Sequence, residues 1–175
     1  MWIGLHLLER FIDMITVALG DITCIPSQAI VNSANPSLLA GAGVSGAIHK
    51  AAGPQLEQAC REMGAVKAGQ AVMTAAFDLP AEFVIHAVAP RYLDGRRGEG
   101  AILADTYTAI CKLVAEHGIT RVTIPSIGTG IYRFPLGLAA EIAVRTLRDN
   151  LEDRCDATFV CFDQATYAAY KEQLG

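Results

Sequence analysis

Residues 29–52 read AIVNSANPSLLAGAGVSGAIHKAA, an apolar run followed by a polar turn, a glycine-rich segment and a helix-like stretch. The run 29–32 contains β-branched side chains and predicts a short strand. Residues 44–52 predict a helix that begins inside the glycine-rich segment 41–46. Glycine lets the backbone approach a ligand closely, and the N–H groups of a helix N-terminus favour anions. This stretch therefore predicts an α/β unit with a phosphate-binding loop.

A second glycine-rich segment, SIGTGIY, occupies residues 126–132. It follows residues 121–124, which predict another short strand. Ligands of α/β sheets bind at the carboxyl ends of the strands, and both glycine segments fall there. We therefore expect the two segments to hold a diphosphate from two sides through their backbone N–H groups.

The rest of the chain alternates strand-length apolar runs with longer helical stretches. Short apolar strands separated by helices predict a sheet that is covered on both faces. We expect an α/β fold, a three-layer α/β/α sandwich with a mixed, mostly parallel central sheet. The expected strands are residues 15–19, 29–32, 70–76, 83–88, 121–124 and 158–161. The expected helices are residues 44–52, 55–63, 101–116, 136–150 and 164–174.

The composition predicts one compact domain over residues 1–175. Hydrophobic residues make up 52% of the chain and charged residues 18%, which excludes a disordered polyelectrolyte. Residues 1–13 are apolar, but they have no basic start, no small-residue cleavage site and too little length to span a bilayer. We expect them to form an N-terminal extension or a short helix, and we expect no membrane association.

Charge and cysteine content narrow the possible partners. The net charge of -4 disfavours a broad basic surface, so nucleic acid is not an expected partner. The five cysteines are an odd number and show no zinc-type spacing, so we expect no metal site and no cofactor. They are typical of reduced, mostly buried thiols in a cytoplasmic protein.

Residues 41–46 also match GxGxxG, the fingerprint of dinucleotide-binding enzymes. In that fingerprint the glycines follow the strand almost directly, and an acidic residue lies about 20 residues further on at the end of the next strand. Here the polar residues 33–37 intervene, and the acidic candidates Glu57 and Glu62 lie in helical sequence. A nicotinamide-dependent oxidoreductase is therefore only a distant alternative.

Several segments, in a fixed order, resemble those of macrodomains. They are GDIT at 20–23, AIVNSAN at 29–35, GAGVSGAIHKAAG at 41–53, VIHAVAP at 84–90, PSIGTGIY at 125–132, FP at 134–135 and CFD at 161–163. The match covers nearly the whole chain from about residue 15. The chain thus resembles the macrodomain family, in particular its bacterial O-acetyl-ADP-ribose deacetylase and mono-ADP-ribosylhydrolase type, and this resemblance implies ADP-ribose binding.

The resemblance implies a role for individual side chains. Asp21, beside the Ile22 N–H, would accept from the adenine amine, and Phe162 would present a flat apolar face to the ring. Asn35 would contact the distal ribose, whereas Asn32 would either contact ribose or brace the loop. The expected ADP-ribose ligands are Asp21, Ile22, Asn32, Asn35, Gly43, Val44, Ser45, Gly46, Ser126, Ile127, Gly128, Thr129, Gly130, Ile131, Tyr132 and Phe162.

Ser45 bears on whether the chain is an enzyme. Many hydrolytic macrodomains similar to this chain carry an aspartate after the glycine-valine pair, where this sequence has Ser45. A neutral hydroxyl is a poor general base. We expect metal-free hydrolysis of ADP-ribosyl esters, on mono-ADP-ribosylated proteins or O-acetyl-ADP-ribose, with Asn35 orienting the distal ribose and Ser45 near the attacking water. A non-catalytic ADP-ribose reader is the alternative.

Overall fold

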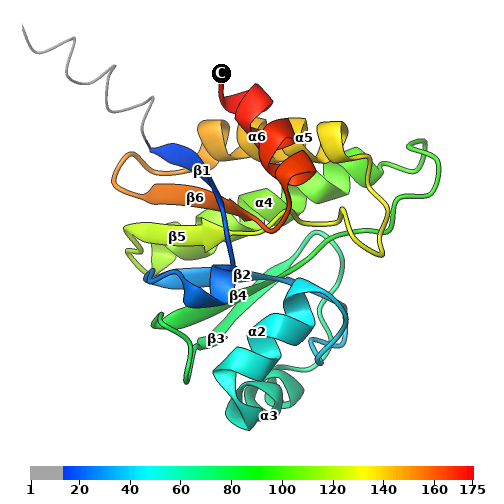
Figure 1. Cartoon of the computed structure of the whole chain (residues 1–175). Helices are drawn as coiled ribbons and strands as arrows, with labels where there is room; N and C mark the ends of the chain where they lie inside the picture. Colours follow the sequence, from blue (N-terminus) through cyan, green and yellow to red (C-terminus); the bar gives the residue numbers. More distant parts are fainter. Residues whose placement is uncertain (1–13) are drawn as a thin grey trace, which may run out of the picture.

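The computed structural model describes residues 14–175, so the extension expected over residues 1–13 lies outside the described residues. A six-stranded sheet in the order β1-β6-β5-β2-β4-β3 runs through the molecule (Figure 1). All neighbouring strands are parallel except β3 and β4, which are antiparallel. The strands are β1 (Ile15–Leu19), β2 (Ala29–Ala34), β3 (Ala71–Ala75), β4 (Phe83–Val88), β5 (Arg121–Ile124) and β6 (Asp156–Cys161).

Helices cover both faces of this sheet. One face carries α4 (Glu99–Glu116), α5 (Leu136–Asn150) and α6 (Gln164–Leu174), and the other carries α2 (Val44–Ala52) and α3 (Pro54–Met63). Neighbouring residues of a central strand divide between the two layers: Val31 belongs to the first core and Ile30 to the second, and both are fully buried. The expected three-layer sandwich with a mixed, mostly parallel sheet is confirmed.

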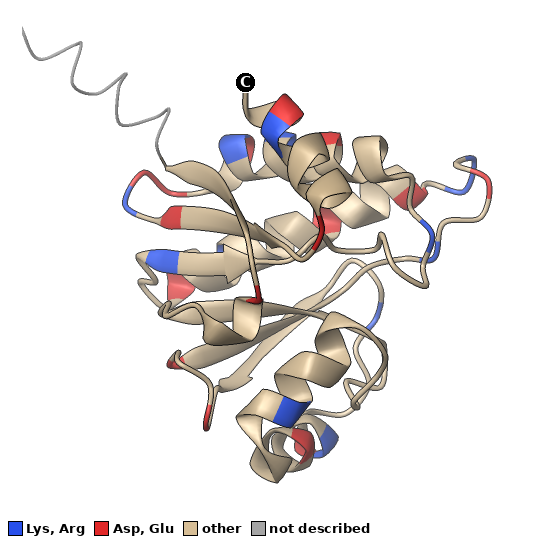
Figure 2. Cartoon of the chain, viewed as in Figure 1, with Lys and Arg blue, Asp and Glu red and all other residues tan. Residues whose placement is uncertain are grey.

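Charged side chains lie mainly on the outer helices and the connecting loops, and the sheet between them carries few (Figure 2). Within residues 14–175 no helix has the length and hydropathy to cross a membrane. All five cysteines are free thiols, and only Cys24 is exposed. Burial raises the pKa of the other four thiols to about 11 or 12. They are therefore protonated at neutral pH.

The structure extends some expected elements and adds one. β2 continues past residue 32 to Ala34, because Asn32, Ser33 and Ala34 stay in parallel register with β4. A 3-10 turn, η1 (Ile22–Cys24), follows β1, and its N-cap Asp21 accepts from the Thr23 N–H. This turn was not expected from the sequence, because three residues carry no periodicity.

Candidate functional site

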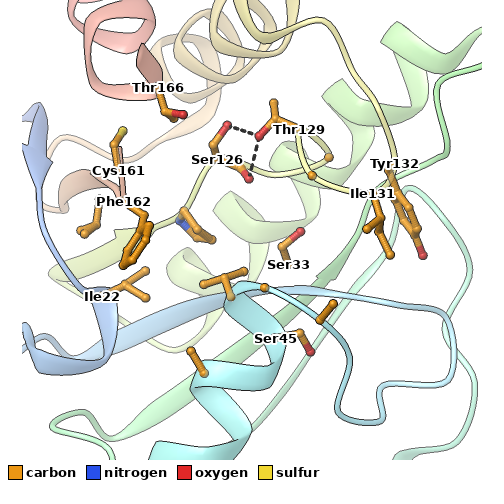
Figure 3. A pocket seen from close by; sticks show the side chains of 18 of the residues that line it. Ile22, Ser33, Ser45, Ser126, Thr129, Ile131, Tyr132, Cys161, Phe162 and Thr166 are labelled. Atoms are coloured by element: carbon orange, nitrogen blue, oxygen red, sulfur yellow. Dashed lines mark hydrogen bonds between the residues drawn. The ribbon is translucent and has the colours of Figure 1, made fainter. Parts of the chain in front are cut away.

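A cleft of about 600 Å³ opens at the carboxyl ends of the central strands (Figure 3). Both glycine segments line it, one before α2 and the other after β5. The strands that reach it, β1, β2, β5 and β6, end at the same edge of the sheet because they are parallel. The cleft is thus where the two segments were expected to meet.

The first glycine segment forms a tight turn at the N-terminus of α2. Gly43 is the N-cap residue and has a φ of 65°, in the left-handed region that favours glycine. A Cβ on Gly46 would lie 2.5 Å from the carbonyl oxygen of Gly41, so only glycine lets the turn fold back on the helix. Gly46 does not line the cleft, and its observed role is packing. The helix N-terminus behind Gly43 and Val44 favours an anion.

The second glycine segment is held by hydrogen bonds and packing from behind. Ser126 Oγ and Thr129 Oγ1 lie 2.8 Å apart, and the Tyr170 hydroxyl donates to Ser126 Oγ. Gly128 has a φ of 82°, and its carbonyl accepts from the Phe134 N–H. Ile127 is fully buried in the core and lies outside the cleft lining, because its side chain anchors the loop.

Apolar side chains mark the two ends of the cleft. Phe162 lies at one end beside Ile22, and its side chain is 87% exposed, which is unusual for a phenylalanine and leaves its ring face free (Figure 3). Ile131, 67% exposed, and Tyr132 lie at the opposite end. The cleft therefore offers a flat apolar surface at one end and a wall of two side chains at the other.

Asp21 lies at the Phe162 end and is exposed. Its Oδ1 accepts from the Thr23 hydroxyl at 2.7 Å and from the Thr23 N–H at 2.9 Å. The side-chain hydrogen bond from Thr23, followed by the backbone one, lowers the pKa of this carboxyl. Both bonds use Oδ1, so an ionised Asp21 keeps Oδ2 available as an acceptor.

The two asparagines occupy different environments. Asn35 lines the cleft, where its Nδ2 donates to the Leu39 carbonyl and its Oδ1 accepts from the Ser37 hydroxyl. Asn32 is fully buried and outside the lining, with its Nδ2 3.2 Å from His86 Nδ1. Successive side chains of a strand point to opposite faces, so Asn32 faces away from the side that carries Ser33. Of the two roles expected for Asn32, contact with ribose or bracing, this buried position favours bracing.

Ser45 is the buried polar group of the first loop. It lies on the first turn of α2, lines the cleft and is 4% exposed. Within the described part of the chain its Oγ has no hydrogen-bond partner. An unpaired buried hydroxyl costs on the order of 1–3 kcal/mol, so this group favours a water or ligand atom that can pair with it.

A buried histidine pair lies behind the first loop. His86 Nδ1 faces the Asn32 amide, which can only donate there, so Nε2 carries the proton and donates to Thr74 Oγ1 at 2.9 Å. Burial, followed by the neighbouring His49, lowers the pKa of His86 to about 4. Burial also lowers the pKa of His49. In the part of the chain that the structure describes, no group of three or more His, Cys, Asp or Glu side chains is arranged to hold a metal ion.

The structure brings thirteen of the sixteen expected ligand residues to the cleft and leaves Asn32, Gly46 and Ile127 outside its lining. It adds residues that sequence reasoning did not single out, some of which, such as Gly41, flank the expected ones. Leu136 and Thr166 lie in the first turns of α5 and α6, and only tertiary packing brings them to the cleft. The added residues are Gly20, Ser33, Ala34, Gly41, Ala42, Ala47, Pro125, Leu136, Val160, Cys161, Asp163 and Thr166.

The sequence pattern of the Macro domain family matches residues 31–143, which include both glycine segments. The chain belongs to this family. It is 47% identical over 167 residues to O-acetyl-ADP-ribose deacetylase 1 of Pantoea vagans, covering 91% of this chain and 98% of the relative. It is 45% identical over 168 residues to the O-acetyl-ADP-ribose deacetylase of Cronobacter sakazakii, covering 92% of this chain and 93% of that relative.

Solved macrodomain structures share the fold of this one. An Oceanobacillus iheyensis macrodomain mutant with ADPR has a TM-score of 0.86 and 37% identity, over 90% of each chain. The Trypanosoma brucei macrodomain in complex with ADP-ribose has a TM-score of 0.88 and 32% identity, over 95% of this chain and 71% of the other. Members of this family with the same architecture thus bind ADP-ribose.

Proposed function

We propose that this macrodomain binds ADP-ribose in the cleft and hydrolyses ADP-ribosyl esters without a metal ion. One observation carries the proposal: two glycine segments from opposite sides line a single cleft, between the flat apolar surface of Phe162 and the wall formed by Ile131 and Tyr132. The ADP-ribose complexes of its structural neighbours and the names of its curated relatives support this choice of ligand and reaction.

The proposed ligand lies along the length of the cleft. The adenine packs on Phe162 and Ile22, with its amine donating to Asp21 Oδ2. The diphosphate accepts hydrogen bonds from N–H groups at the N-terminus of α2 and in the second glycine segment. The distal ribose then reaches Asn35 and the wall formed by Ile131 and Tyr132. This arrangement uses backbone donors in place of lysine or metal.

The proposed reaction is attack of water on the carbonyl carbon of an ester carried by the distal ribose. The bond between that carbon and the ribose oxygen breaks, the ribose hydroxyl takes up a proton, and the carboxylic acid leaves. Ser45 Oγ, which has no partner among the described residues, would hold the water. Since a neutral hydroxyl does not deprotonate water, the phosphate oxygens of the bound substrate would serve as the acceptor for its proton.

A reader that binds ADP-ribose without hydrolysing it is the second candidate. It is favoured by Ser45, because among residues 14–175 no carboxylate lines the cleft beside the first glycine segment. The acidic lining residues are Asp21 and Asp163, the chain neighbours of Ile22 and Phe162. The two candidates predict the same ligand and differ only in turnover.

Calorimetry with ADP-ribose tests the shared part of both candidates. Gly130 lines the cleft and has open space around its Cα, so Gly130→Glu places a negative charge near the diphosphate with little strain. Gly128 is less suitable, because its positive φ strains any substitution. We expect Gly130→Glu to weaken binding at least tenfold. Gln58→Glu on α3 adds the same charge outside the cleft and should leave affinity unchanged; equal affinities for both variants would contradict this placement of the ligand.

Turnover separates the two candidates. O-acetyl-ADP-ribose and a protein mono-ADP-ribosylated on glutamate are incubated with the native chain, Ser45→Ala and Ser45→Asp. If the chain is a hydrolase, the native chain should release ADP-ribose from both substrates. Ser45→Ala should release less, and Ser45→Asp should release more because it supplies a carboxylate base. If the native chain binds ADP-ribose but releases none from either substrate above background, the chain is a reader and not a hydrolase.

A further inference from the structure

The distal end of the cleft continues outward into an exposed surface. The loop 89–98, between β4 and α4, lies against the second glycine segment, because the Tyr92 N–H donates to the Tyr132 carbonyl at 2.8 Å. The Tyr92 ring also packs against the Phe134 ring, with centroids 5.0 Å apart. Figure 1 shows the two loops together at the right of the molecule. We call Arg91, Leu93, Ile131 and Arg133 the distal rim.

The distal rim is built on fixed backbone. Glu99, 3% exposed, accepts hydrogen bonds from four backbone N–H groups of the loop, those of Leu93, Asp94, Gly95 and Arg97. Burial of this carboxyl raises its pKa, but the backbone hydrogen bonds outweigh burial and bring the pKa to about 2. The carboxylate is therefore ionised at neutral pH, and its hydrogen bonds stabilise this conformation of the loop.

Arg133 is fixed in a different way. It has a φ of 61°, a conformation that costs a non-glycine residue on the order of 1 kcal/mol. Its N–H donates to the Gly130 carbonyl, and the next N–H, that of Phe134, donates to the Gly128 carbonyl, so the turn maintains this strain. The Arg133 side chain points into solvent.

The distal rim combines cationic and apolar groups. The Arg91 guanidinium lies over the Tyr132 ring, 5.1 Å from its centroid, and Leu93 and Ile131 are 63% and 67% exposed. Among residues 14–175 neither Arg91 nor Arg133 pairs with a carboxylate. Residues 89–99 together with Arg133 carry four arginines against the two carboxylates of Asp94 and Glu99, in a chain whose net charge is -4 (Figure 2). The local charge is therefore opposite in sign to that of the whole molecule.

This chemistry fits an acidic polypeptide better than a nucleic acid. Unpaired guanidinium groups bind carboxylates in forked geometry, and exposed leucine and isoleucine side chains can be covered by a polypeptide. A nucleic acid binds through its phosphates and by stacking its bases on aromatic rings, and one face of the Tyr132 ring is already occupied by Arg91. We propose that the distal rim docks an acidic segment of the protein that carries the ADP-ribose, an inference that rests on the proposed function.

Binding of ADP-ribosylated peptides tests the distal rim. Two peptides carry ADP-ribose on a central residue through a non-hydrolysable amide linkage, one flanked by glutamates and the other by lysines, and free ADP-ribose is the reference. We expect the glutamate peptide to bind about fivefold tighter than free ADP-ribose, and the lysine peptide to bind more weakly than it. The difference should vanish at about 0.5 M salt, because exposed pairs are screened.

Charge reversal assigns the preference to the rim. Arg133→Glu should remove the advantage of the glutamate peptide and leave the affinity for free ADP-ribose unchanged, and Arg91→Glu is a second variant with normal backbone geometry. Arg121→Glu, at the start of β5 and so at the opposite edge of the sheet, is the matched control and should keep the preference.

The possible failures are distinguishable. If the two peptides bind with equal affinity and free ADP-ribose still binds, the docking role of the distal rim is wrong and the proposed function is unaffected. An ADP-ribosylated single-stranded oligonucleotide that binds more tightly than the glutamate peptide, in a manner lost in Arg133→Glu, would overturn the acidic-polypeptide partner. Absence of binding to free ADP-ribose would overturn the proposed function and, with it, this inference.

Discussion

At the level of single residues, Gly46 shows how a glycine can serve a binding loop without contacting the ligand. A Cβ there would lie 2.5 Å from the Gly41 carbonyl oxygen, whereas a Cβ on Gly137, also in the first turn of a helix, would meet no neighbouring group within 4 Å. We expect Gly46→Ala to lower the free energy of unfolding by about 1–3 kcal/mol through overpacking. Gly137→Ala should raise it by up to about 1 kcal/mol, because alanine favours helix.

Urea unfolding of both variants measures this difference, and calorimetry shows whether the loop still binds ADP-ribose. Gly46→Ala should also weaken binding, because the turn cannot close on α2. If both substitutions had the same effect on stability, the close approach of the loop to the helix would not be what requires glycine at residue 46.

The same residues show how far the sequence predicts the site. The glycine segments and the polar residues after strands identified most of the cleft, since backbone ligands depend on local sequence. Asn32 and Asn35 are both asparagines beside one turn, and only the extent of β2 decides which of them faces the cleft. That extent depends on pairing with β4, a long-range contact that a single sequence does not reveal. For the same reason Leu136 and Thr166 were missed.

At the level of elements, His86 joins three strands of the sheet. It lies on β4, faces Asn32 on β2 and donates to Thr74 on β3, and it is fully buried. Its pKa in the folded chain is about 4, below the value of 6.5 expected for the unfolded chain. Between these values the unfolded chain binds more protons, so stability decreases as the pH falls.

We expect the free energy of unfolding to fall by about 2 kcal/mol between pH 7 and pH 5, and by about 3 kcal/mol at pH 4, from His86 alone. The lowered pKa of His49 acts in the same direction. Urea unfolding across this range measures the change. His86→Gln should flatten the profile, whereas His117→Gln, which changes an exposed ring, should leave it as it is. A profile unaffected by His86→Gln would contradict the assignment to this histidine.

The elements themselves were largely predictable, because runs of four to six apolar residues between glycines and polar turns specify buried strands. The expected and observed bounds agree for β1, β4, β5, α2, α5 and α6. The bounds differ where contacts with a neighbouring segment determine the end of a strand or helix. β6 begins at Asp156 rather than residue 158, because Asp156 and Ala157 pair with β5. α4 begins at Glu99 rather than residue 101, because the Glu99 carboxylate accepts hydrogen bonds from backbone N–H groups of the preceding loop.

At the level of the whole molecule, the cleft lies where the two packed layers meet. Ile22 and Val160 line it from the core beneath α2 and α3, while Cys161 and Leu136 line it from the core and the packing beneath α4, α5 and α6. A ligand that fills the cleft contacts both layers and the loops between them. A ligand that binds the folded chain and not the unfolded chain therefore raises the free energy of unfolding of both layers together.

ADP-ribose at about one hundred times its dissociation constant should stabilise the fold by about 2.7 kcal/mol. For a chain of this size that corresponds to a rise in Tm of about 5–10 °C, measured by scanning calorimetry at increasing ligand concentration. Gly130→Glu, which we expect to bind at least tenfold more weakly, should show at most about half of this rise at the same concentrations, while Gln58→Glu should follow the native chain. A Tm that does not depend on ADP-ribose concentration would contradict the cleft as its binding site, because a ligand held by both layers cannot bind without stabilising them.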